Sequence, residues 1–547
     1  MMHRNRSVDV HQFAMVPRAE IPRASFSIQK THKTTFDAGY LVPVYCEEIL
    51  PGDSFKVKMT AFGRLSTPIF PIMDNLWLDS FFFFVPNRLV WKSWVKFMGE
   101  QDNPGDSISY VVPTCKSPTG GWVGGTVYDY FGLPTIGQVG VANTVTVNVL
   151  PLRGYNLIYN KWFRDENMVN ARPENYGDGP DNTTADYVLV RRGKRHDYFT
   201  SCLPWPQKGG SVALPLGTVA PVRALAGVAD STPTNGLLWR DTAGAGYTGT
   251  GRLGIDGSVV AGQTFKDANA FIKSGPTLAP SNLWADLSQA SAATINQLRT
   301  SFQIQKLLER DARGGTRYTE IVRAHFGVVS PDARLQCPEY LGGGSSPLII
   351  NPVAQTSATG LSGGSSPQGN LSAIGTVLAH GHGFTQSFTE HGFVIGLVCV
   401  RADLTYQNGL RKMWSRSTRY DYYFPAFANL GEQAVLNQEI FVDGSANDSA
   451  VFGYQERWAE YRYSPSMITG LFRSYVGGTL DAWHLAQRFT SVPTLGQTFI
   501  DETPPLSRVL AVGGGAGGAQ IIFDSFFDMQ VARPMPMYSV PGLIDHF

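Results

Sequence analysis

The sequence is poor in charge. Lysine, arginine, aspartate and glutamate together make up 16% of the 547 residues, whereas about a quarter is usual for a soluble domain. The formal net charge is only +1. The chain as a whole therefore lacks the positive field typical of nucleic-acid-binding proteins, and any contact with nucleic acid must come from a local patch.

Cysteine is scarce and has no metal-binding or redox spacing. The five cysteines are odd in number, widely separated and without a CxxC pair: Cys46, Cys115, Cys202, Cys337 and Cys399. This usage argues against a disulfide framework and against a zinc site, and it favours reduced thiols in a reducing compartment.

Long apolar runs are also missing. The first thirty residues contain no apolar run of the kind found in a signal peptide. No stretch approaches the ~18 apolar residues of a membrane span. We therefore expect neither a secretion signal nor a transmembrane segment.

The motifs of common enzyme classes are absent as well. The chain contains no P-loop, no GxGxxG after a strand, no HExxH and no GxSxG. The close spacing of His380, His382 and His391 suggests a metal site, but only Glu390 and the distant Cys399 are available to complete it, so loop histidines are the preferred interpretation. We expect no enzyme, no metal and no cofactor.

Glycine, proline and aromatic residues are abundant. The chain has 58 glycines and 34 prolines, and aromatic residues make up 12% of it. This composition indicates a loop-rich, mainly β protein with more than one structural unit or with large insertions. Low charge with high aromatic content suits a subunit that buries much of its surface against copies of itself. A large ordinary β-protein remains the alternative.

Two segments give the clearest strand signals. Residues Ser54–Ala61 alternate, with Phe55 and Val57 on the apolar side and Lys56 on the other, as in a half-buried strand. Leu76–Val85 is nearly all apolar, so this strand must be covered on both faces. It is either the middle of a sandwich or a surface that another chain covers.

Further elements are expected along the chain. We predict one helix over Asn87–Met98 capped by Asn87, a second over Leu152–Val169, a third over Ser291–Arg310 and a fourth after Gly315. Leu341–Gly383 contains GGSSP twice and is predicted to be turns joining short strands. Strands are expected at Phe388–Val400 and Ile521–Val531, and the aromatic block Tyr420–Phe427 is assigned to a core or an interface.

Several long phrases resemble the major capsid protein of gokushoviruses, small single-stranded DNA phages of the microvirus family. They are KTTFDAGYLVPVYCEEILPGDSF, TPIFPIMDNLWLD, VPNRLVW, KRHDYFTSCLPWPQKG and RPMPMYSVPGLIDHF. The resemblance implies a mainly β fold, an eight-stranded antiparallel jelly roll with large loop insertions and a few helices. It also implies about sixty copies in a T=1 icosahedral shell around circular single-stranded DNA.

The same resemblance implies partners and a location. The partners would be other copies of the chain, the DNA genome, scaffolding, pilot and small DNA-binding phage proteins, and a host surface receptor. The location would be the virion, with assembly in the cytoplasm of the host bacterium. The family also has a surface insertion that forms threefold protrusions, and the Gly-, Ala- and Thr-rich stretch 211–290 is its expected position. The domains are thus a basic arm (1–33), the first part of the jelly roll (34–210), the insertion (211–290) and the second part (291–547).

Two basic stretches are candidates for contact with DNA or with a neighbouring subunit. Met1–Lys33 has little periodicity and indicates an extended arm. Arg191–His196 is the densest basic run in the chain. The alternative for the first stretch is a solvated tail, and for the second a solvated loop. The candidate residues are Arg4, Arg6, Arg18, Arg23, Lys30, Lys33, Arg191, Arg192, Lys194 and Arg195.

A second hypothesis is a carbohydrate-binding or glycoside-hydrolysing β-protein. Asp501–Glu502, or Asp524 with Asp528, would then supply the paired acids. Such a protein would have a cleft lined by carboxylates, whereas a capsid subunit needs no cleft.

Overall fold

The computed structural model describes residues 22–183, 185–212, 295–329, 331–356, 369–515 and 518–538, together with six short strands between residues 222 and 285. The chain divides into two compact units. The first unit comprises residues 1–206 and 314–547, and the second comprises residues 207–313.

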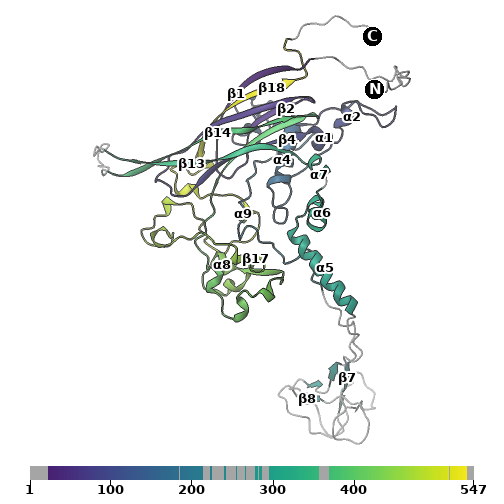
Figure 1. The fold of residues 1–547 in the computed structure, drawn as a ribbon, viewed down its shortest axis with the longest axis vertical. Helices are drawn as coiled ribbons and strands as arrows, with labels where there is room; N and C mark the ends of the chain where they lie inside the picture. Colours follow the sequence, from purple (N-terminus) through teal and green to yellow (C-terminus); the bar gives the residue numbers. More distant parts are fainter. Residues whose placement is uncertain are drawn as a thin grey trace, which may run out of the picture. The chain divides into compact units, whose positions relative to one another are not determined.

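An eight-stranded antiparallel sheet forms the framework of the first unit (Figure 1). Its strands are β1 (Ala24–Phe36), β2 (Val42–Ile49), β3 (Ser54–Leu65), β4 (Leu76–Pro86), β13 (Glu339–Ala354), β14 (Leu371–Ser387), β15 (Gly392–Ala402) and β18 (Ile521–Arg533). The strand order is β1-β18-β3-β14-β13-β4-β15-β2. The first and last long strands of the chain, β1 and β18, therefore pair along their whole length.

This strand order is that of a jelly roll. Numbered one to eight along the chain, the strands follow the order 1-8-3-6-5-4-7-2, which is two four-stranded halves joined through the β13–β14 pair. The sheet is nearly closed, with β1 and β2 at its two edges. Two interleaved four-stranded halves are the pattern of viral capsid jelly rolls. The predicted fold class is confirmed.

The core lies between the two halves of the sheet. Every second residue of β3 points into it, so Phe55, Val57, Met59 and Ala61 are buried while the lysines between them are exposed. The strand β18 alternates in the same way. The predicted half-buried strand at Ser54–Ala61 is confirmed.

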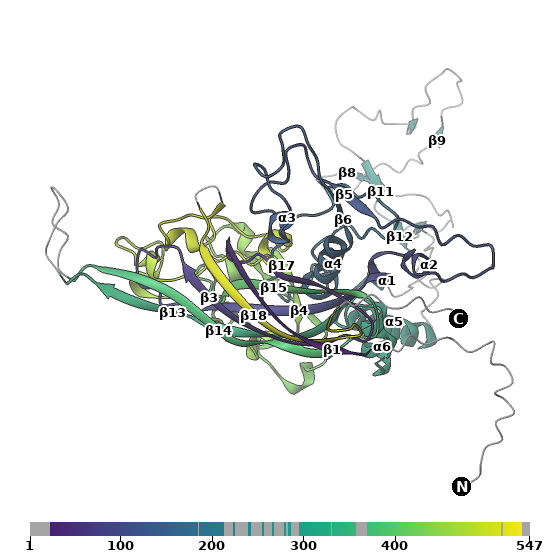
Figure 2. The same cartoon turned by 90° about the horizontal axis from the view of Figure 1, so that it is seen from above.

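Strand β4 is covered on both faces within the chain. Its Phe82 and Phe84 pack into the core of the sheet. Its Phe83 and Val85 pack into a second apolar cluster on the other face, together with Tyr155 of helix α4 (Leu150–Ile158). Figure 2 shows α4 beside β4 and β15. Leu76–Val85 is therefore the middle of a sandwich, which is the first of the two alternatives given for this strand.

The helices of the first unit are short. They are α1 (Asn87–Val90), α2 (Trp94–Phe97), α3 (Val127–Tyr130), α4, α6 (Tyr318–Phe326), α7 (Asp332–Leu335), α8 (Asn437–Ile440) and α9 (Gln497–Ile500). The single helix predicted over Asn87–Met98 is wrong: Trp91 is fully buried with an extended backbone and separates α1 from α2, and the residue at the N-cap is Pro86. The helix predicted to reach Val169 ends in a π-helical turn, η3 (Tyr159–Phe163).

The glycine-rich segment 341–383 also differs from its prediction. Residues 341–354 belong to the long strand β13 and residues 371–383 to the long strand β14, and Figure 2 shows these two strands extending together beyond their neighbours. The glycines are needed because the strands approach closely. A Cβ atom on Gly343 would lie 2.0 Å from the carbonyl oxygen of Ser80, and one on Gly342 would lie 2.5 Å from that of Gly383. The second GGSSP copy lies outside the described residues.

Smaller strand pairs complete the first unit. The pair β5 (Thr114–Lys116) and β6 (Thr146–Asn148) lies in the loops after α2, and β16 (Glu432–Leu436) pairs with β17 (Val451–Glu456). A third apolar cluster, which includes Phe199, supports this last pair.

The second unit contains α5 (Ile295–Arg313) and three short strand pairs. The pairs are β7 (Val222–Ala224) with β12 (Leu283–Ala285), β8 (Trp239–Asp241) with β11 (Leu278–Pro280), and β9 (Gly254–Ile255) with β10 (Phe265–Lys266). The expected insertion at 211–290 falls within this unit, and most of its residues lie outside the described part of the chain. Helix α5 corresponds to the helix predicted over Ser291–Arg310.

Candidate assembly and nucleic-acid surfaces

The basic residues near the N-terminus lie partly on an edge strand. Arg4, Arg6 and Arg18 are outside the described residues. Lys30 and Lys33 belong to β1, so the regular structure begins within the predicted arm rather than after it. Arg23, just before β1, donates a hydrogen bond to the Ser54 hydroxyl at 2.8 Å and remains exposed.

Lys30 connects the two edges of the sheet. Its ammonium lies 2.9 Å from the Glu47 carboxylate on β2 and 5.6 Å from the centre of the Tyr45 ring. Lys33 instead pairs with Asp524 on the neighbouring strand at 2.8 Å, where both side chains are largely exposed. Lys30 therefore helps to close the barrel, and Lys33 remains available at its surface.

The run Arg191–His196 is divided between interior and surface. The Arg191 guanidinium donates to the carbonyl oxygens of Ala38 and Glu502 and lies 4.0 Å from the centre of the Tyr40 ring. Lys194 is only 6% exposed, and its ammonium donates to the carbonyl oxygen of Phe499 at 2.5 Å. Burial lowers the pKa of Lys194 to about 8, against the opposing effect of nearby carboxylates.

Arg192 takes part in a buried ion network around Asp79. The Asp79 carboxylate accepts hydrogen bonds from Arg192, from Arg401 at 2.8 Å and from the Ser345 hydroxyl at 2.5 Å. Burial alone would raise the pKa of Asp79, but the hydrogen bonds from Ser345 and Arg192 and the two guanidinium charges outweigh it, so the pKa falls below its ordinary value.

Contact of this run with DNA or a neighbouring subunit stays a prediction, and the guanidinium of Arg191 is already used by carbonyl oxygens of the chain itself. Arg192 and Lys194 have partners within the chain because their neighbours in the fold, Asp79 and Phe499, supply a carboxylate and a carbonyl oxygen. Arg195 and His196 are exposed, and neither side chain has a polar partner among the described residues. The density of positive charge in the sequence predicts the position of this run, but it does not predict which of its side chains are buried.

A cavity of about 650 Å³ opens beside the exposed part of the run. Its basic side includes Arg164, Arg195 and His196. Its other side is aromatic and is formed by Phe81, Phe83, Trp162, Phe163 and Tyr340. Trp162, which lies in the segment predicted as a helix over Leu152–Val169, is 49% exposed. Its pairing with Tyr340, from a strand that was not expected, was missed.

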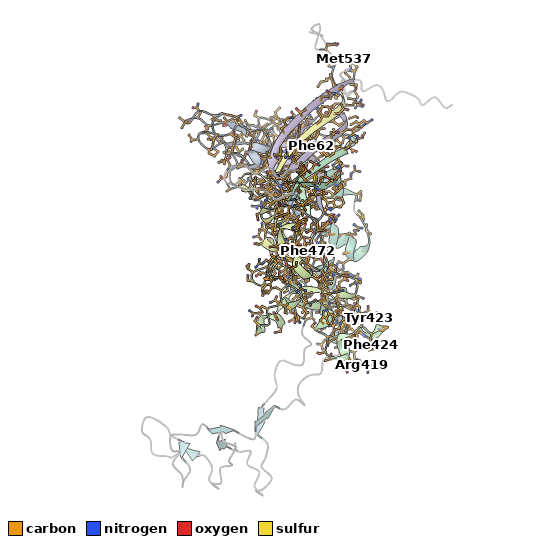
Figure 3. The ribbon with its side chains drawn as sticks, turned by 90° about the vertical axis from the view of Figure 1, so that its left-hand side faces the viewer. Phe62, Arg419, Tyr423, Phe424, Phe472 and Met537 are labelled. Atoms are coloured by element: carbon orange, nitrogen blue, oxygen red, sulfur yellow. The ribbon has the colours of Figure 1, made fainter. Side chains whose placement is uncertain are left out.

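Exposed aromatic residues form a separate aromatic surface, which we define as Trp414, Tyr420, Tyr422, Tyr423, Phe424 and Tyr461. All six are exposed or half-buried, so of the two alternatives given for Tyr420–Phe427, a core or an interface, the core does not apply. Arginines lie over two of the rings: Arg416 is 4.3 Å from the centre of Tyr461, and Arg419 is 5.3 Å from that of Phe424. Figure 3 shows Arg419, Tyr423 and Phe424 side by side, well separated from Phe62 on the sheet.

The outer face of the jelly roll also has an apolar area. Phe62 on β3 pairs with Leu378 on β14, and they are 49% and 68% exposed. Ile522 and Phe526 on β18 lie diagonally across from Phe62 and are exposed as well. Adjacent apolar residues on an exposed sheet face are typical of a protein interaction site.

The histidines considered for a metal site are held apart. His382 is buried between the hydroxyls of Ser80 and Ser346, at 2.7 and 2.9 Å. His380 contacts Thr60, and His391 packs on Trp94. Within the described part of the chain, no three His, Cys, Asp or Glu side chains are grouped as metal ligands. Among the helices that the structure describes, none has both the length and the apolar character of a membrane span.

Comparison with known proteins agrees with this architecture. The family model described as "Capsid protein (F protein)" matches residues 14–543. Three relatives carry the name Capsid protein VP1. The one from Bdellovibrio phage phiMH2K is 48% identical over 541 residues, the one from Chlamydia phage 1 is 45% identical over 596 residues, and the one from Spiroplasma virus 4 is 39% identical over 551 residues. Each alignment covers 98% of both chains.

These matches confirm the resemblance to gokushovirus capsid proteins that the long sequence phrases indicated. The relatives are structural proteins of virus particles, so they support a major capsid function and a place in the virion. A family model that spans nearly the whole sequence and relatives that align from end to end lead to one conclusion: the chain belongs to the capsid protein (F protein) family of phages.

Proposed function

We propose that this chain is the major capsid protein of a small phage and that about sixty copies assemble into a closed T=1 icosahedral shell around circular single-stranded DNA. The proposal rests above all on the eight-stranded jelly roll with its uncovered apolar and aromatic side chains. Assembly would occur in the cytoplasm of the host bacterium, with scaffolding, pilot and small DNA-binding phage proteins as partners.

The aromatic surface is the strongest candidate for contact between copies. Tyrosine, tryptophan and arginine are enriched in the energetically important centres of protein interfaces. The aromatic surface combines these residue types, because Arg416 and Arg419 lie over its rings. The apolar area around Phe62 is a second candidate. In a closed shell, both would be buried against neighbouring copies.

The exposed basic residues are candidates for sequence-independent contact with DNA phosphates. Among the described candidates these are Arg23, Lys33 and Arg195. Arg4, Arg6 and Arg18 belong to the same proposal. Lys30, Arg191, Arg192 and Lys194 do not, because each is at least partly buried and its charge has a partner inside the chain.

The DNA content of assembled particles tests this assignment. Combined substitution of Arg23, Lys33 and Arg195 by Ala should lower the DNA packaged per particle, measured by nucleic-acid absorbance after gradient purification. Arg462→Ala is the matched control, because Arg462 is exposed and its ion-pair partner, Glu456, is an exposed residue as well. Normal DNA content in the triple variant would contradict the role of these residues.

The carbohydrate hypothesis has no comparable support. Among the described residues that line the cavity, Asp165 is the single carboxylate. Glycoside hydrolysis ordinarily uses two carboxyl groups across the scissile bond. Glu502, one of the acids considered for this role, is buried at 2% exposure.

A further inference from the structure

We infer that the cavity between Trp162, Tyr340 and Arg195 is a binding site for one nucleotide of single-stranded DNA, with the base on the aromatic side and the phosphate on the basic side. The inference builds on the proposed enclosure of single-stranded DNA. It adds a defined site, in which an unpaired base is held by stacking in addition to phosphate contact.

The cavity has the size that such a ligand needs. Its volume of about 650 Å³ lies within the range of ~300–1,000 Å³ that is common for small-molecule sites. All of its described lining residues belong to the first unit.

The aromatic side provides a supported stacking platform. The rings of Trp162 and Tyr340 are 49% and 43% exposed. Both rest on Phe83, with ring centres 5.4 and 5.5 Å away. The indole NH of Trp162 donates to the carbonyl oxygen of Pro338 at 2.9 Å, which fixes the orientation of the ring. Exposed aromatic rings of this kind stack on any base, because every base has a π face.

The basic side has hydrogen-bond donors without partners. Arg195 and His196 are exposed, and neither side chain has a polar partner among the described residues. The third basic side chain, Arg164, has a partner, because its Nη1 donates to the carbonyl oxygen of Val169 at 2.9 Å. The opposing carboxylate, Asp165, already accepts a hydrogen bond from the backbone NH of Asn167 at 2.9 Å. The unused donors therefore favour an anion such as phosphate.

The backbone on both sides of the cavity departs from regular structure. Trp162 and Phe163 lie in the π-helical turn η3 that follows α4. Tyr340 lies at an irregularity in the pairing of β13 with β4, where the register shifts between Tyr340 and Gly342. Both π-turns and bulges re-aim side chains and occur frequently at functional sites. Together they direct aromatic rings from distant segments to one place.

Binding of a short oligonucleotide to the full-length chain tests the site directly. The probe is fluorescein-labelled oligothymidine of about eight nucleotides, followed by fluorescence anisotropy at several salt concentrations. Trp162→Ala should weaken binding about 5- to 150-fold, the effect of losing one stacked base. Arg195→Ala should weaken binding and reduce the slope of log affinity against log salt by about one. Tyr318→Ala, at an exposed aromatic residue of α6 outside the cavity, should leave the affinity unchanged.

Two further measurements separate stacking from phosphate contact and from misfolding. An abasic oligonucleotide of the same length should bind equally well to the unaltered chain and to Trp162→Ala. A probe with 5-iodouracil should crosslink on irradiation to a peptide that contains Trp162 or Tyr340 in the unaltered chain, which requires no variant to fold.

The inference is overturned if Trp162→Ala binds oligothymidine as tightly as the unaltered chain, or if the crosslinks map elsewhere. It is also overturned if oligothymidine fails to bind while an aromatic, acidic peptide does, because the cavity would then serve a protein partner. Particle formation is scored separately by electron microscopy. Shells without binding at this site contradict the site alone, and binding without shells contradicts the proposed function alone.

Discussion

At the scale of single residues, Asp79 connects segments that are far apart in the sequence. Its carboxylate on β4 binds Arg401 on β15, Ser345 on β13 and Arg192 in the basic run. Asp79 and Arg401 are only 5% and 3% exposed. Removing one member of such a buried pair leaves an uncompensated charge, which costs far more than the loss of an exposed ion pair.

We predict that Asp79→Asn lowers the free energy of unfolding by about 3–5 kcal/mol, because two guanidinium groups lose their counter-charge. Urea unfolding of the unassembled chain measures the change. Asp524→Asn is the matched control: its partner Lys33 is exposed, so the loss should stay below about 1 kcal/mol. Equal losses in the two variants would contradict the network.

Single residues also show why the site could be predicted only in part from the sequence. The density of positive charge located Arg191–His196. The inward direction of Arg192 and Lys194 depends on Asp79 and Phe499, which are more than a hundred residues away in the chain. Long-range partners of this kind leave no local pattern. Trp162 and Tyr340 are likewise far apart in the chain and become neighbours only in the fold. Their contact in the cavity could therefore not be predicted from the sequence.

At the scale of elements, close packing explains the glycine run in β13. The backbone of Gly343 lies so near to β4 that a Cβ atom would overlap the Ser80 carbonyl oxygen at 2.0 Å. The contacting atom belongs to the backbone of a buried strand, so it cannot move aside without disturbing the ladder.

Gly343→Ala should therefore destabilise the chain by about 3 kcal/mol or more. The soluble yield and the urea midpoint give the measurement. Gly477→Ala serves as the control, because no atom lies within 4 Å of the position of its added Cβ. A Gly343 variant as stable as the Gly477 variant would show that β13 and β4 can separate without cost.

Elements with strong periodicity were predictable from sequence. The alternation in β3, the apolar run of β4 and the last strand β18 all follow from side-chain burial on a period of two. The strands β13 and β14 were missed because glycine in a strand is chosen for close approach, while in sequence it is typical of turns. The predicted helix at Asn87–Met98 failed because burial of Trp91 interrupts it.

At the scale of the whole molecule, the chain divides into two compact units. The three apolar clusters of the first unit contain no residue from 207–313 among the residues that the structure describes. The folding of the jelly roll should therefore not depend on the second unit. We propose that the insertion at 211–290 instead acts outside the shell, in attachment to the host.

Deletion of residues 215–285, replaced by a short glycine-serine linker, should leave the thermal midpoint of the first unit nearly unchanged and should reduce adsorption of particles to host cells. Scanning calorimetry and a cell-binding assay measure the two effects. An insoluble product would mean that the segment is part of the core, and normal adsorption would contradict the attachment role.

Negative-stain electron microscopy with mass determination, applied to the full-length chain alone and with its phage partners, tests the shell proposal most directly. We predict uniform closed particles of about sixty subunits, in which the aromatic surface and the area around Phe62 are buried between copies. A monodisperse monomer or dimer under both conditions would contradict the shell, and the exposed aromatic residues would then need another partner.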